Sequence, residues 1–354
     1  MKKTQVALAA LALVASTAAL AEVKMSGIID IGVASTTKNS AGNGGTFMEQ
    51  GSYTDHSSVD LDVSEDLGGG LKAHASLGMG FDANGYNDNG GTAGSGVAGT
   101  SSHFNRQSYV GLSGDFGTIN LGKQLSPFIL SNVLMTNGVG NFYVNRMFFG
   151  GNGGLAAGGS GLNASGFFIT NAIQYTTPSI SGWTATVMTT TPSGTHGNVI
   201  NAGTTPADAD RYTAYRLGGS LGALNLTAAY QTRKNTYTSW NAGGTMQLME
   251  GLTGSLGYLK NTNEGADSVG SYNVGLSYAL TGATTATVQY AKGDKNGGDQ
   301  SLANLTLANA LSKRTTAYVT LARGENGISG ALGAFLGTVD KSNTTAIVGV
   351  AHTF

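Results

Sequence analysis

The chain alternates apolar residues with small or polar ones up to its last residue, Phe354. One side of the final segment carries Ala346, Val348, Val350, His352 and Phe354. Because successive side chains of a β-strand point to opposite faces, this period of two predicts a strand with one apolar face. The same segment offers mostly small or polar residues to its other face, so the two faces of the predicted sheet meet different surroundings.

The same alternation recurs along the chain, with clear examples at 58–64, 71–81, 224–231 and 271–280. Such segments have the length and the pattern of strands that cross a membrane. The connections between them are alternately short and long, and both kinds are rich in Gly and Asn, as turns require. We therefore predict an all-β fold, an antiparallel transmembrane β-barrel of about 16 strands closed by its first and last strands.

The N-terminus has the features of a secretory signal. Lys2 and Lys3 precede an apolar run over 6–14, and Ala19-Leu20-Ala21 forms a cleavage site. We expect residues 1–21 to be a signal peptide and 22–354 to be one barrel domain. Neither the apolar run nor any later stretch is long enough for a membrane helix, and lipid otherwise tolerates only closed sheets.

The composition fits one lipid face and one wet face. Only 11% of residues are charged, Gly reaches 56 and there is no Cys, so disulfides do not hold the loops. A soluble β-sandwich is the alternative, but it does not need so many strands of similar length with apolar faces. A formal net charge of −1 gives no indication of nucleic-acid binding.

Aromatic residues fall near the ends of the predicted strands. Aromatic girdles at both membrane interfaces are typical of such barrels. We assign to the outer face Tyr109, Tyr175, Trp183, Tyr215, Tyr230, Trp240, Tyr258, Tyr272, Tyr278, Tyr290 and Phe354.

Several motifs together resemble the general porins of beta-proteobacteria. They lie at 64–73, 104–112, 116–124, 171–178 and 311–315 and at the terminal His352-Thr353-Phe354. The resemblance implies a homotrimer in the Gram-negative outer membrane, surrounded by lipid and lipopolysaccharide, with one water-filled pore per barrel. It also implies passive diffusion of small hydrophilic solutes and ions, no cofactor, and a long third loop folded into the pore.

The third connection, from Gln124 to Phe168, is the longest. In the family that the chain resembles, this loop forms one wall of the pore constriction. Many general porins place acidic residues there, but Arg146 is the only charged residue in this stretch. The electric field across the pore that is familiar from those porins is therefore in doubt for this chain.

The resemblance also supplies candidates for the opposite wall of the constriction. Arg106 matches a wall arginine and Arg146 matches a loop arginine of anion-selective members, whereas Ser58 stands at a wall position that is often basic. Asp60, Asp62 and Lys72 have the parity of lumenal side chains, as do Arg216 and Arg233. Basic side chains in a narrow pore favour anions, so we expect a weak anion preference. In the alternative, Arg106 and Arg146 pair with Asp60, Asp62 or loop carbonyls and only hold the loop.

Two other functions compete with that of a general pore. A substrate-specific channel would use aromatic residues of the third loop, namely Phe142, Tyr143, Phe148 and Phe149. A barrel enzyme would need a nucleophile beside a base, and no grouping of Ser, His and acid stands out. The five His residues have no metal-binding spacing, and 294–299 reads as a solvated loop tip despite its oxygen ligands.

Overall fold

The computed structural model describes residues 21–37, 44–50, 53–54, 57–81, 83, 104, 106–136, 168–191, 211–233, 237–263, 268–293, 300–325 and 342–354. Nearly all of these residues lie in strands, and in this part of the chain no helix has the length and hydrophobicity needed to cross a membrane. The strands are β1 (Glu22–Thr36), β2 (Gly45–Gln50), β3 (Ser57–Gly68), β4 (Leu71–Phe81), β5 (Ser108–Gly114), β6 (Gly117–Leu125), β7 (Phe168–Thr176), β8 (Trp183–Thr190), β9 (Tyr212–Leu221), β10 (Leu224–Arg233), β11 (Tyr237–Met249), β12 (Leu252–Asn263), β13 (Val269–Ala279), β14 (Thr284–Gly293), β15 (Gln300–Ala310), β16 (Thr315–Glu325) and β17 (Asn343–Thr353).

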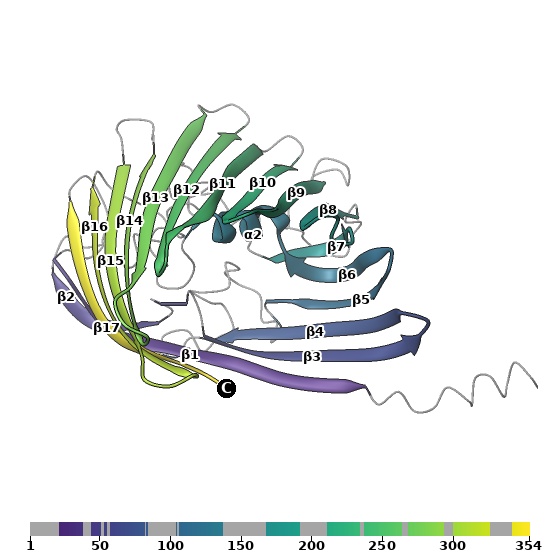
Figure 1. The fold of residues 1–354 in the computed structure, drawn as a ribbon, viewed down its shortest axis with the longest axis horizontal. Coiled ribbons are helices and arrows are strands. Elements are labelled where there is room, and N and C mark those ends of the chain that lie inside the picture. The colour runs from purple at the N-terminus through teal and green to yellow at the C-terminus, as the bar shows by residue number, and fades with distance from the viewer. Residues whose placement is uncertain are drawn as a thin grey trace, which may run out of the picture.

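The strands form one antiparallel sheet that closes on itself (Figure 1). Residues 28–36 of β1 pair with β17 on one edge, and the other edge of β1 pairs with β2 and β3. Phe354 completes the seam, because its N–H donates to the Gly27 carbonyl and the Gly27 N–H donates to its carbonyl, both at 3.0 Å. This closure confirms the predicted barrel.

One strand of the barrel is interrupted. β2 pairs with the second half of β1 (residues 31–36), and β3 pairs with the first half (residues 22–28), so both lie at the same position in the barrel wall. The 17 segments therefore make a 16-stranded barrel. Residues 45–50 form β2, although none of the alternating segments singled out in the sequence covers them.

Between β2 and β3, the described residues Tyr53 and Thr54 reach the inner face of the seam. Asp30 of β1, which is fully buried, accepts hydrogen bonds from the N–H of Tyr53 (2.9 Å), the N–H of Thr54 (2.8 Å) and the Thr54 hydroxyl (3.0 Å). Its other carboxylate oxygen accepts from the Tyr318 hydroxyl at 2.8 Å. We call this group of four residues the Asp30 latch.

Aromatic packing supports the Asp30 latch. The rings of Tyr53 and Tyr318 stack with their centroids 5.2 Å apart. Tyr318 reaches β1 across Gly349 of β17, where any Cβ atom would collide with the tyrosine ring and hydroxyl. Burial and the nearby Asp30 carboxylate raise the pKa of Tyr53, so this phenol stays neutral at physiological pH.

The outer face carries the predicted aromatic residues as a continuous band over β9–β14. Ring centroids are 6.5 Å apart for Tyr215 and Tyr230, 5.2 Å for Trp240 and Tyr258, and 6.4 Å for Tyr272 and Tyr290. Although these rings pack against each other, each side chain remains more than a third exposed. Amphipathic rings in this arrangement suit the interface between lipid and water.

Tyr109 is an exception, and its assignment to the outer face was wrong. Its ring makes an edge contact with His74 and faces the lumen beside Asn120 and Gln124. The reason is the strand period of two. Val110 and Leu112 of β5 are exposed on the outer face, so Tyr109, one residue before Val110, points to the lumen.

The Asp30 latch gives a prediction about stability. Replacing Asp30→Ala leaves two backbone N–H groups and two hydroxyls without their acceptor, and should lower the free energy of unfolding by about 3 kcal/mol. The measurement is urea unfolding of the refolded barrel in detergent, followed by its shift in gel mobility. Asp66→Ala is the control, because Asp66 accepts from the Gly68 N–H in an exposed turn and should cost about 0.5 kcal/mol. An equal loss in the free energy of unfolding for the two variants would contradict a structural role for the Asp30 latch.

Candidate functional site

The third connection begins with a short helix inside the barrel. Helix α2 (Pro127–Leu134) starts at Ser126, whose hydroxyl accepts from the N–H groups of Phe128 (3.2 Å) and Ile129 (3.5 Å). A serine cap followed by proline at the first helical position favours a helix start at this point. The helix packs against the inner faces of β8, β9, β10 and β11 (Figure 1).

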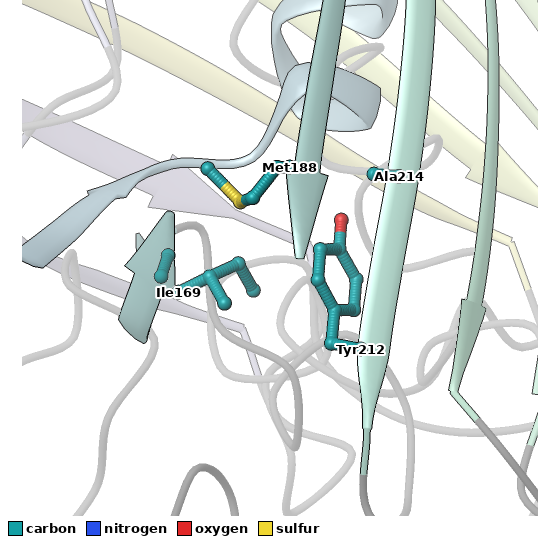
Figure 2. Packing of buried hydrophobic residues seen from close by; sticks show 5 residues of the cluster. Ile169, Met188, Tyr212 and Ala214 are labelled. Atoms are coloured by element: carbon teal, nitrogen blue, oxygen red, sulfur yellow. The ribbon is translucent and has the colours of Figure 1, made fainter. Parts of the chain in front are cut away.

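The start of α2 is anchored to β9. The Ser126 hydroxyl lies 2.6 Å from that of Tyr212, and the Tyr212 hydroxyl donates to Gln231 of β10 at 3.0 Å. Below this contact, Tyr212 packs with Ile169, Ala172, Met188 and Ala214 in an apolar cluster on the inner wall of β7–β9 (Figure 2). The cluster supports the Tyr212 side chain that contacts the start of α2.

Asn241 of β11 anchors the middle of α2. Its amide nitrogen donates to the Phe128 carbonyl (3.2 Å) and to the Asn132 side-chain oxygen (2.6 Å), and its oxygen accepts from the Ser131 hydroxyl (2.7 Å). Ser131 also contacts the Thr227 hydroxyl at 2.9 Å. The first residues of the third connection are therefore held on the lumenal wall by buried polar contacts.

The rest of the third connection, 137–167, lies outside the described residues. Arg146 and the aromatic residues Phe142, Tyr143, Phe148 and Phe149 are in this part. That the whole loop folds into the pore and that Arg146 lines a constriction both stay predictions. The aromatic residues of a substrate-specific channel are likewise untested.

Arg106 and Asp60 lie at the same height on the lumenal wall. Asp60 of β3 pairs with Gly78 of β4, and the Arg106 N–H donates to the Gly78 carbonyl at 3.1 Å. The Arg106 guanidinium sits over the ring of Phe168, 4.9 Å from its centroid. Phe168 is the first residue of β7, so Arg106 lies where the third connection returns to the wall. A cation in this position is attracted by the negative face of the ring.

The acidic residues of β3 are hydrogen-bonded to neutral groups. Asp60 accepts from the Ser58 hydroxyl (2.9 Å) and from the Gln107 amide (3.4 Å), and Asp62 accepts from the Ser76 hydroxyl (2.6 Å). Within the described part of the chain, neither carboxylate forms an ion pair. Asp60 and Asp62 therefore bind neutral groups of the same wall on which Arg106 contacts the Phe168 ring.

Lys72 lies far from this level. It pairs with Asp66 next to the short turn between β3 and β4, six positions along β4 from Gly78. At about 3.3 Å per residue this separation is roughly 20 Å. Of the candidates that the structure describes, Ser58, Asp60, Asp62 and Arg106 come together, and Lys72 lies near one mouth of the barrel.

A second lumenal feature was not foreseen as a site. A cavity of about 210 Å³ lies between the start of α2 and the wall of β5–β9, and it is lined by Tyr109, Gln124 and Arg216 among others. The parity of Arg216 indicated a lumenal side chain, but the cavity depends on where α2 docks. The described residues contain no group of three or more His, Cys, Asp or Glu side chains that could hold a metal.

The docking of α2 gives a prediction about the open pore. Asn241→Ala removes three hydrogen bonds to the helix, which should weaken its docking on the wall by about 2 kcal/mol. The start of the third connection should then move on the wall, and single-channel current noise should rise at least about twofold. Asn225→Ala is the control, since Asn225 is an exposed lumenal residue of β10 whose side chain, among the described residues, accepts a hydrogen bond from Ser220. Equal noise from both variants in planar bilayers would contradict the anchoring role of Asn241.

Comparisons with known proteins agree with this architecture. A family model described as "Gram-negative porin" matches residues 7–329. Outer membrane porin protein 32 of Delftia acidovorans is 30% identical over 384 aligned residues, covering 100% of both chains.

Solved structures share the fold. The anion-selective porin from Comamonas acidovorans is 24% identical with a TM-score of 0.74, covering 94% of this chain and 100% of its own. The trimer form of OmpT from Vibrio cholerae is 12% identical with a TM-score of 0.64, covering 94% and 99%. The closed barrel, the lumenal helix and these matches together show that the chain belongs to the family of Gram-negative porins.

Proposed function

We propose that this outer-membrane diffusion channel admits small hydrophilic solutes and ions with a weak preference for anions. The carrying observation is the placement of acidic and basic groups on the lumenal wall. The carboxylates of Asp30, Asp60 and Asp62 are bound by hydroxyl, amide and backbone donors. Such bonds hold these side chains against the wall and leave the charge of an ionised carboxylate in place.

Basic residues share the lumenal face with these acids and with Glu22 and Asp66, which have the same parity. Besides Arg106, the residues with lumenal parity on the described strands include Lys24, Lys72, Arg216 and Arg233. A narrow channel with low-dielectric walls focuses such a field and raises the local concentration of anions. Rings of basic side chains give the same selectivity in other pores.

The preference should be weak because opposite charges share one level. Asp60 lies at the height of Arg106 and reduces its field there. Mobile ions screen the remaining electric field over a distance of about 8 Å at physiological ionic strength. The similar solved porin from Comamonas acidovorans is named as anion-selective, which supports the direction of the proposal.

The assembly and export of the chain are part of the same proposal. Three copies form a homotrimer among lipid and lipopolysaccharide, and residues 1–21 are removed on export. The similar OmpT was solved in a trimer form, which supports this assembly. Mass measurement of the purified protein in detergent should give three chains per particle, each starting at Glu22. A monomer would contradict the proposed homotrimer, and a chain that keeps residues 1–21 would contradict their removal on export.

Paired substitutions test the selectivity. Arg106→Gln should lower the ratio of chloride to potassium permeability about two- to threefold, and Asp60→Asn should raise it by a similar factor, since each removes one unit charge at the same height. Both are read from the zero-current potential across a KCl gradient. Changes of the same sign, or no change in either variant, would show that this level does not control selectivity.

A further inference from the structure

The interrupted strand beside β1 contains more residues than the wall of the barrel needs. Ile31 of β1 pairs with Gln50 of β2, and Ile28 of β1 pairs with Ser58 of β3. Between these two pairs β1 has two residues, 29 and 30, whereas the neighbouring strand has seven, 51–57. An antiparallel strand that continued in register would place two residues opposite two. The surplus of five residues exceeds an ordinary β-bulge, which adds about one.

One serine closes the wall where the strand is interrupted. The Asp30 N–H donates to the Ser57 hydroxyl at 3.1 Å, and this hydroxyl donates to the Asp30 carbonyl at 3.4 Å. Ser57 is fully buried. Both backbone groups of Asp30 therefore have a partner, as the surrounding lipid requires, although no strand segment pairs with Asp30 on this edge. Tyr53 and Thr54 are not needed to complete the wall.

Tyr53 lies on the lumenal side of the interruption. Asp30 alternates with the exposed Ile29 and so points inward, and its carboxylate holds the backbone N–H of Tyr53. Tyr318 also points inward, because the next residue, Val319, is exposed on the outer face. The Tyr53 ring covers the Tyr318 ring, with an angle of 15° between their planes. Tyr318 is 2% exposed and Tyr53 is half-buried, so Tyr53 is the layer that meets the water of the lumen.

Three contacts fix the Tyr53 ring in this place. Its backbone is bonded to Asp30, its ring stacks on Tyr318, and its hydroxyl hydrogen-bonds with the Thr316 side chain. Tyr318 is itself fixed, because its hydroxyl donates to Asp30 at 2.8 Å. A side chain that is supported by packing and hydrogen bonds keeps a constant shape, which an element that selects among solutes requires.

Tyr53 and helix α2 lie on opposite sides of the pore. In the closed ring of 16 strands, β10 is eight positions from β1 in both directions, and α2 packs on β9 and β10. Asp30 of β1 contacts Tyr53, and Thr227 of β10 contacts α2 through Ser131. Asp30 and Thr227 are both near the middle of their strands. The two elements therefore face each other across the lumen at a similar depth.

We propose that Tyr53 narrows the pore from the side opposite α2 and helps to set the size limit for solutes. This narrowing element comes from the interruption of a wall strand and is separate from the third connection. The diameter of a pore is one of the properties that determine which solutes pass. The proposal rests on the proposed function, because a size limit has a meaning only for an open pore.

Substitutions of different size test the narrowing in the full mature protein in planar bilayers. Tyr53→Ala should raise the single-channel conductance in KCl about 1.3-fold, and Tyr53→Trp should lower it by a similar factor, because each changes the free cross-section. Tyr53→Phe keeps the ring and should leave the conductance unchanged. Tyr272→Ala is the matched control, since Tyr272 is exposed on the outer face, and it should also change nothing. Swelling of liposomes in sugars of increasing size should show a higher size limit for Tyr53→Ala alone.

The absence of cysteine from the chain allows a direct test of where this side chain points. Tyr53→Cys introduces a single thiol, and a water-soluble methanethiosulfonate reagent added to the open channel should lower its current by about a fifth. A reagent that carries a sulfonate should also shift the zero-current potential toward cations, and one that carries a trimethylammonium group should shift it toward anions. Tyr272→Cys is the control and should not respond, because its side chain lies on the outer face.

The outcomes separate the role of Tyr53 from that of the pore. Equal conductance of Tyr53→Ala, Tyr53→Phe and Tyr53→Trp would overturn the narrowing, as would a Tyr53→Cys channel that ignores both reagents. If the Ala and Cys variants failed to fold, Tyr53→Trp and Tyr53→Phe would still decide, since both keep an aromatic ring on Tyr318. A channel that conducts but is insensitive to these changes refutes only this inference, whereas a protein that does not conduct refutes the proposed function.

Discussion

The structure depends on the rule that every backbone N–H and carbonyl in lipid must find a partner within the protein. Pairing β1 with β17 meets this rule for the whole sheet, and the bonds between Gly27 and Phe354 extend it to the last residue. Gly27 is required there, because a Cβ atom would collide with the Phe354 ring and with the β3 backbone. Once the sheet is closed, each strand has one face for lipid and one for water, and the period of two follows.

The lumen is then shaped by two elements that leave the regular wall. The Asp30 latch holds Tyr53 and Thr54 on one side, and Asn241 with Tyr212 holds α2 on another. Both use buried polar contacts, which are satisfied only in one arrangement and therefore specify where each element sits. Because α2 docks on β8–β11, it encloses the cavity at Arg216, so the position of the helix determines a chemical feature of the pore.

Local patterns explain which parts could be predicted from the sequence. Strands and their outer faces follow from alternation, as at Val348 and Val350, because adjacent residues carry that signal. The break between β2 and β3 depends on Asp30 and Tyr318, which are 288 residues apart, so no local pattern reports it. Helix α2 did have a signal, Ser126 followed by Pro127, which we did not use. The common height of Arg106 and Asp60 needs the register between strands, which periodicity alone does not give.

A channel with this lumenal wall should favour anions, though weakly. The most direct test is the zero-current potential of the unaltered, purified protein in a planar bilayer across a KCl gradient. We expect stepwise conductance and an anion-directed potential that shrinks as the salt concentration rises on both sides. A cation-directed potential would mean that Asp60, Asp62 and other acids dominate the field, and would contradict the account.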